Sequence, residues 1–387
     1  MTPQLEAEQA LLGAVLLAPR QLTVVSGWLE PRHFHRPAHV AIFEALLAQR
    51  DAGHRALSDA ATEADLRDWA LQAMTAAALA SPSFTPGYGH TLIEACPQAD
   101  HAPVYGRMVL ETAVRRALQE HAHRLLDAAS AGRADADDAQ AAVALTLALQ
   151  RVVEQLSDAW GSIDNRRGRR LPAAAPARLS ERAVEATLNH EAMLLGSLTA
   201  APGQVGDLAR WLRPEDFLDP GHGAVYQALV GLSHRGEPVD ALTVLWEVQR
   251  RGALTSRVTS REQVRALCRG GFTGDPGYWA ELVLRASLIR SAATSAGIVR
   301  VLALDASLSA APLLGSAVQA LEPALRVQRR WRAATGQDPP PAEPAPPGRR
   351  QEAALTRSHT PAQGAPEPAP SPAGQAAAVR PGLRSSS

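Results

Sequence analysis

The chain has 387 residues, and its 39 basic and 39 acidic side chains give a net charge of zero at pH 7. This balance excludes a broad electrostatic attraction to nucleic acid as the basis of function. Aromatic residues make up only 4% of the chain, so we expect cores of Leu, Val and Ala, as in helical bundles. The length itself predicts two to three domains.

The N-terminal segment gives no sign of secretion or membrane insertion. Its first apolar stretch follows Glu6 and Glu8, whereas a signal peptide begins with a basic segment. We find no apolar stretch that approaches the ~20 residues needed to cross a bilayer. We therefore expect a cytoplasmic chain with no membrane partner.

Helical periodicity begins close to the N-terminus. The apolar residues of 11–16 share one face of a predicted amphipathic helix. A turn follows at 28–34, where Pro31 can occupy an early helical position without losing a hydrogen bond. A second helix is predicted from about Pro37 to a left-handed cap near Gly53.

An Ala-rich helical segment at 59–80 precedes a predicted helical hairpin. One long helix runs from Tyr105 to about Leu126, and a polar turn follows at 132–138. A second helix returns to Trp160. A helix, a short polar turn and a second helix together form an αα-hairpin.

The same motifs then recur at a constant offset. Residues 8–13 match 191–196, and residues 28–34 match 211–217, so that both pairs lie 183 residues apart. Trp, Pro, Phe and apolar positions match without a gap over some forty residues. This self-similarity predicts a tandem duplication of one domain.

The chain therefore divides into four segments. Residues 1–160 form copy 1, and residues 184–333 form copy 2. Between them, 161–183 is predicted to be an Arg/Pro/Ala linker, and 334–387 a disordered Pro/Ala-rich tail. The arginines of 166–170 fit a solvated linker better than a patch that contacts phosphates.

Four motifs, in this order, resemble those of the N-terminal domain of the bacterial replicative DNA helicase, the DnaB family. The family pattern is an E-x-A-[VL]-L-G helix, then L-x-P-x-D-F, then P-x-H-x-x-[IV]-[FY]-x-A-[ML], then G-x-P-V-D. Copy 2 carries all four, at 191–196, 212–217, 220–229 and 236–240. Copy 1 carries three but departs at the fourth, in 53–58. The resemblance covers roughly 1–156 and 186–333, and it implies an all-α fold of two tandem domains, each with a helical hairpin.

The resemblance also bears on catalysis. The family's chemistry belongs to a RecA-like ATPase domain, which needs a Gly-rich phosphate loop with a Lys. All 39 basic residues of this chain are Arg. No Ser/His/Asp or paired-carboxylate arrangement stands out either. We expect a chain that is not an enzyme and has no catalytic residues and no cofactor.

Three histidines, His33, His35 and His39, have a spacing that suggests a metal site. Copy 2 keeps only the last of them, as His222. Two of three ligands would therefore be missing from a copy that otherwise keeps its pattern. A structural histidine near a helix start is the favoured interpretation, and no metal site is expected.

The two cysteines lie at similar positions in the two copies. Cys96 and Cys268 each follow a short apolar helix, which favours one buried thiol per copy. The alternative is a disulfide between the copies, which is unusual in a cytoplasmic chain.

The resemblance implies partners as well. In the family, N-terminal domains assemble as a collar that receives the primase C-terminal domain. The chain is therefore expected to be a non-catalytic protein–protein interaction module of DNA replication, bound by primase or by a replicative helicase collar. The alternative is a DNA-binding accessory protein that works through arginines, notably those of 166–170 and Arg326, Arg329, Arg330 and Arg332. Steep weakening of binding by salt would identify it. A relic without a partner is a third hypothesis.

We also expect intramolecular pairing of the two copies. Both keep the hairpin, and a single hairpin with an apolar stripe needs a partner face. A linker of about 25 residues reaches roughly 25–30 Å as a flexible coil, which permits the pairing. The apolar faces of 109–125 and 282–301 would then be core or docking surface.

Overall fold

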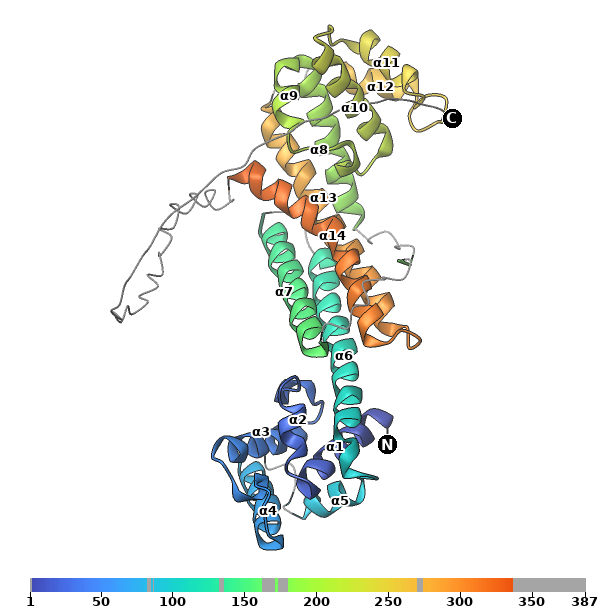
Figure 1. Cartoon of the computed structure of the whole chain (residues 1–387). Helices are drawn as coiled ribbons and strands as arrows, with labels where there is room; N and C mark the ends of the chain where they lie inside the picture. The colour runs from blue at the N-terminus through green and yellow to red at the C-terminus, as the bar shows by residue number, and fades with distance from the viewer. Residues whose placement is uncertain are drawn as a thin grey trace, which may run out of the picture. The chain divides into compact units, whose positions relative to one another are not determined.

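A computed structural model describes residues 2–81, 85, 87–131, 136–161, 171–172, 180–269 and 274–336. Within these ranges the chain forms fourteen α-helices and five 3-10 helices, and no strand (Figure 1). The predicted all-α fold class is confirmed. Most of the predicted linker, including the arginines of 166–170, lies outside the described residues, as does the predicted tail beyond Gly336.

The head of copy 1, residues 2–101, surrounds its first helix. Its elements are α1 (Pro3–Leu17), α2 (Gln21–Val25), η1 (Pro31–His33), α3 (Pro37–Asp51), η2 (Arg55–Leu57), α4 (Glu63–Ala80), α5 (Tyr88–Glu94) and η3 (Ala99–His101). All residues from Ala7 to Leu16 are buried, since α1 packs against α3, α4 and α5 and against the hairpin that follows. The helix predicted to be amphipathic is therefore a central helix, buried on every side.

The glycine of the first motif has a packing role. A Cβ atom added to Gly13 would lie 2.0 Å from the carbonyl oxygen of Leu92 in α5. The backbones of α1 and α5 approach so closely that a residue without a side chain is required at this position.

The head of copy 2, residues 181–268, repeats this arrangement with a different second half. Its elements are α8 (Glu181–Ala200), η4 (Pro202–Gln204), α9 (Val205–Leu208), η5 (Pro214–Asp216), α10 (Pro220–Arg235), α11 (Ala241–Arg250) and α12 (Arg261–Cys268). The predicted left-handed caps are present, because φ is 69° at Gly53 after α3 and 66° at Gly236 after α10.

The fourth motif is the N-terminal cap of α11. The carboxylate of Asp240 accepts the backbone N–H groups of Leu242 and Thr243 at 2.8 and 2.9 Å. Copy 1, which departs from this motif, caps its α4 differently: Thr62 accepts the N–H of Asp65 at 3.3 Å, and Asp65 accepts the N–H of Thr62 at 2.8 Å. The divergent sequence therefore still starts a helix here, five residues later than the offset of 183 places the start of α11.

Each head is followed by a long helical hairpin. Copy 1 contributes α6 (Ala102–Ala131) and α7 (Ala136–Trp160), and copy 2 contributes α13 (Pro276–Leu304) and α14 (Ala310–Thr335). Helix α13 packs along α8 and α14 of its own copy and also along α6 and α7. Arg115 of α6 donates to the carbonyl oxygen of Asp305 at 2.8 Å, and Gln119 donates to that of Ala303 at 3.2 Å.

Helix α13 departs from the expectation that no apolar stretch approaches membrane-spanning length. Among the described residues it is the one helix long and apolar enough to cross a membrane, with a mean hydropathy of 1.3 over an 18-residue window. However, 67% of that window is buried against other helices of the protein. The core helix of a folded domain has the same composition, and packing accounts for the apolar character of α13.

Candidate functional site

A buried hydrogen bond between a carboxyl group and a histidine joins the first and third motifs of copy 1. Glu8 lies in α1, and its Oε2 is 2.6 Å from Nδ1 of His39 in α3. The other carboxylate oxygen accepts the backbone N–H of His35 at 2.6 Å. On its far side, Nε2 of His39 lies 3.0 Å from the hydroxyl of Tyr88, to which Gln9 also donates at 2.9 Å.

Copy 2 contains the same pair. Glu191 Oε2 lies 2.8 Å from Nδ1 of His222, and the two residues are 31 positions apart, as in copy 1. The Glu191 carboxylate also accepts the backbone N–H groups of Leu218 and Asp219. A buried carboxylate is stable only when such partners replace water, so this pair fixes the chain between the turn and the second helix.

The three histidines of the suggested metal site do not converge. His39 is bound to Glu8, whereas Nδ1 of His33 accepts the backbone N–H of Glu30 at 3.0 Å and the side chain of His35 is exposed. In the described part of the chain, no three His, Cys, Asp or Glu side chains are grouped so that they could hold a metal ion. His39 is the structural histidine that the sequence predicted, but its carboxylate partner was missed. The signal was available, since Glu8 and His39 are both repeated in copy 2.

The position of His33 is occupied in copy 2 by Asp216, which ties the turn of η5 to the hairpin. Asp216 is buried and forms an ion pair with Arg330 of α14. Nη1 of Arg330 donates to Oδ2 of Asp216, and Nη2 donates to Oδ1 at 2.9 Å. The hydroxyl of Ser287 in α13 donates to the same carboxylate at 2.9 Å. In copy 1, Arg116 of α6 donates to the carbonyl oxygen of His33 at 3.0 Å, as Arg290 of α13 donates to that of Asp216 at 2.6 Å.

The cysteines are both free thiols. Cys268 is buried, as predicted, but Cys96 is only half-buried. Burial raises the pKa of both thiols, which therefore resist ionisation and the reactions of a thiolate.

The outer face of α11 exposes a pair of large apolar side chains. Leu242 and Trp246 lie one helical turn apart and are 73% and 70% exposed. On the opposite face, Val244 and Val248 are buried in the head of copy 2. Helix α11 is therefore apolar on both sides, and only one side is covered in the structure.

Helix α11 is held in place by a buried carboxylate with three arginines. Glu247 accepts hydrogen bonds from Arg235 at 3.0 Å, from Arg250 at 2.8 Å and from Arg251 at 2.7 Å. Arg235 comes from α10, so the charged cluster links the two helices. Leu242 and Trp246 are therefore exposed on a helix whose position this charged cluster fixes.

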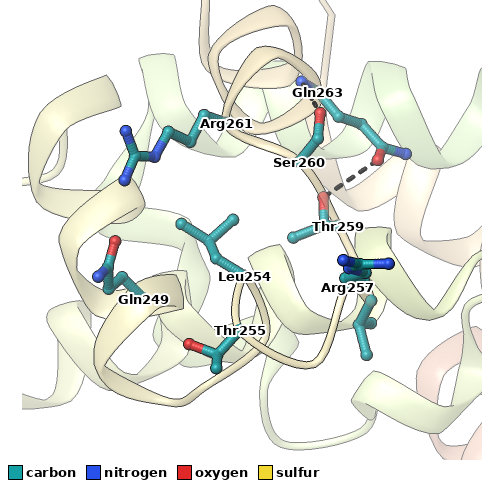
Figure 2. A pocket seen from close by; sticks show the side chains of 9 residues that line it. Gln249, Leu254, Thr255, Arg257, Thr259, Ser260, Arg261 and Gln263 are labelled. Carbon is teal, nitrogen blue, oxygen red and sulfur yellow. Dashed lines mark hydrogen bonds between the residues drawn. The ribbon is translucent and has the colours of Figure 1, made fainter.

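A hollow of about 520 Å³ opens where α11 ends and α12 begins. Figure 2 shows Gln249 and Arg261 on one side of it and Arg257 on the other, with Leu254 between them. Among the described residues that line this hollow, none carries a carboxylate. Gln249 is three residues beyond Trp246, so the exposed face of α11 leads towards the hollow.

The comparisons with known proteins agree with this structure. The family model described as "DnaB-like helicase N terminal domain" matches residues 1–111 and 184–284. The DnaB replicative DNA helicases of Mycobacterium leprae, Leifsonia xyli and Geobacillus stearothermophilus are 36%, 33% and 36% identical over 26%, 29% and 30% of this chain. These matches span only 17%, 25% and 23% of the relatives' own lengths.

Among solved structures, the crystal structure of the N-terminal domain of DnaB helicase from Mycobacterium tuberculosis is 28% identical to this chain. The match covers 35% of this chain and 95% of the solved chain, with a TM-score of 0.32. The two regions that the family model matches begin at the two copies of the repeat. The chain therefore belongs to the DnaB-like helicase N-terminal domain family and carries that domain in tandem.

Proposed function

We propose that this chain is a non-catalytic interaction module of DNA replication, and that the outer face of α11 in copy 2 binds a replication protein. The observation that carries the proposal is the exposure of Leu242 and Trp246, at 73% and 70%, on a helix whose opposite face is buried. The partner is the primase C-terminal domain or the collar of a replicative helicase. The similarity to replicative DNA helicases supports the link to replication.

An exposed tryptophan beside a leucine is an energetically favourable anchor for a partner. Tryptophan is enriched among the few interface residues that carry most of a binding energy. The neighbouring hollow, lined by polar groups such as Gln249 and Arg261, supplies hydrogen-bond donors at the edge of the apolar pair. This combination of an apolar centre and a polar rim is typical of protein interfaces.

Copy 2 is the better candidate for this role. The family's Gly236–Asp240 motif is intact there, and Asp240 is the cap that begins α11. Copy 1 has the longer α4 in this place, whose exposed leucines, Leu71 and Leu79, lie two turns apart instead of one. We therefore expect copy 2 to contribute most of the affinity.

The test uses the intact chain and two variants. Immobilised chain should capture the primase C-terminal domain or the replicative helicase, and Trp246→Ala should weaken the captured complex by roughly tenfold or more. Leu71→Ala, which removes an apolar side chain of copy 1 that is 62% exposed, is the control and should leave affinity unchanged. Equal affinities for the two variants, or no capture of either partner, would refute the proposal.

Salt separates this function from arginine-mediated DNA binding. Apolar docking on α11 should persist at moderate salt, whereas binding to DNA phosphates falls steeply as salt rises. We further propose that the two copies pair within one chain. The donations from Arg115 and Gln119 of copy 1 to the last turn of α13 support this pairing.

A further inference from the structure

A second cavity, of about 540 Å³, lies between η5, α13 and α14 of copy 2. Four arginines line it: Arg213, Arg326, Arg329 and Arg330. The half-buried Ser291 also faces it. Cavities of about 300–1,000 Å³ are large enough for a small ligand.

The four guanidinium groups are not equally available. Arg330 is occupied by its ion pair with Asp216, and Arg329 pairs with Glu322 at 2.9 Å. The side chains of Arg213 and Arg326, by contrast, are exposed and make no hydrogen bond or ion pair with any residue that the structure describes. Two free cations therefore border one cavity.

The wall behind these two arginines is fixed. The carboxylate of Asp216 is held by Arg330, by the Ser287 hydroxyl at 2.9 Å and by the backbone N–H of Arg213 at 2.7 Å. Its charge is therefore already balanced within the protein. Glu215 is the lining carboxylate that remains free to repel an anion.

We propose that this cavity binds a phosphate group between Arg213 and Arg326. A guanidinium presents a planar fork of N–H donors that matches phosphate oxygens, and such charge-assisted hydrogen bonds are among the strongest in proteins. The hydroxyl of Ser291 supplies a further donor. The phosphate belongs either to a nucleotide or to the backbone of a nucleic acid.

Copy 1 lacks such a site. At the matching positions, 183 residues earlier, Glu30 replaces Arg213 and Arg32 replaces Glu215. Arg32 and Glu30 form an ion pair with each other at 2.9 Å, so the cation in copy 1 is already neutralised. The site is therefore assigned to copy 2 alone.

The experiment measures binding of three probes to the full chain at low salt: inorganic phosphate, ATP and single-stranded oligothymidylate. Binding of ATP or phosphate without the oligonucleotide identifies a free phosphate as the source, and binding of the oligonucleotide alone identifies nucleic acid. Arg213→Gln and Arg326→Gln should each lower the affinity for the bound probe by about tenfold. Glu215→Gln should raise the affinity for the probe, because a competing negative charge is removed.

Arg300→Gln is the matched control. Arg300 is an exposed arginine on α13, nine residues or about 13 Å beyond Ser291, and its loss changes the net charge equally. It should leave binding within twofold. The proposal is overturned if no probe binds, or if Arg213→Gln and Arg326→Gln behave like this control. Because none of these residues lies on α11, capture of a replication protein stands or falls separately.

Discussion

Glu191 is a carboxylate with no exposed surface, and its charge is held by one imidazole and two backbone N–H groups. Replacing it with Ala leaves His222 and both N–H groups without their acceptor. We expect Glu191→Ala to lower the free energy of unfolding by about 3–5 kcal/mol. Urea unfolding of the intact chain, followed by circular dichroism, measures this. The exposed Glu185→Ala on the same helix should change stability by less than about 0.5 kcal/mol; equal effects would contradict the structural role.

His33 makes the stability of copy 1 depend on pH. Burial lowers its pKa from 6.5 to about 4, so the unfolded chain takes up a proton at higher pH than the folded chain. The contribution of His33 to stability is therefore complete above about pH 6.5 and is lost as the pH falls towards 4. The loss is at most about 1.4 kcal/mol for each pH unit.

The variant His33→Gln should show a smaller loss of stability between pH 7.5 and pH 5 than the parent chain. The measurement is the urea midpoint at the two pH values. His35→Gln, which removes an exposed histidine two residues away, should keep the parent's pH dependence. If His35→Gln flattened the dependence and His33→Gln did not, the assignment to His33 would be wrong.

The repeat made His39 and His222 stand out as structural residues, but it did not identify their partners. Helical periodicity tells which face of a helix is buried, and it does not tell which residue of another helix lies opposite. The Asp216–Arg330 pair was missed for the same reason, since 114 residues separate its members. The arginine that binds Asp216 was instead assigned to possible DNA contacts on the basis of its charge alone.

At the scale of the helix, the Asp240 cap connects a sequence motif to the proposed docking face. Asp240→Ala removes the acceptor of two N–H groups and should cost about 0.5–2 kcal/mol of stability. Because the cap begins the helix that carries Trp246, affinity for the partner should fall as well. Asp240→Asn retains a capping oxygen and should preserve both properties. The measurements are urea unfolding and capture of the partner; a loss of affinity in both variants would argue against a role of the cap.

The order of the helices follows closely from the repeat, the prolines and the glycine caps. The burial of α1 on every side did not follow, because polar residues such as Glu8 and Gln9 are typical of a solvent-exposed face. They are buried because each finds a partner, Glu8 in His39 and Gln9 in Tyr88. The glycine at position 13 likewise follows from the close approach of α5 and not from the pattern of α1 itself. Tertiary contacts therefore decided what the local pattern left open.

The pairing of the two copies can be tested on a chain that is expressed as one polypeptide and cut afterwards. A protease site placed within 162–170 would cut the chain after folding, and the two halves should then elute together on gel filtration. Arg115→Ala with Gln119→Ala removes the hydrogen bonds to the end of α13 and should release the halves. Arg124→Ala is the control and should not; Arg124 lies on the same helix and, within the described part of the chain, pairs with Glu120. Separate elution of the parent halves would contradict the pairing.

The chain is not expected to hydrolyse ATP. Hydrolysis by the family's phosphate loop depends on a Lys that reaches the β- and γ-phosphates, and these 387 residues contain no Lys. The arginines of the α13–α14 cavity offer hydrogen bonds to a phosphate but no described group to orient an attacking water. If the cavity takes a free phosphate, we therefore expect the purified chain to bind ATP without hydrolysing it. Release of phosphate from ATP by the parent chain, abolished by Arg326→Gln, would contradict this expectation. Release that survives Arg326→Gln and Arg213→Gln and falls away on further purification would come from a contaminating enzyme and leave the expectation intact.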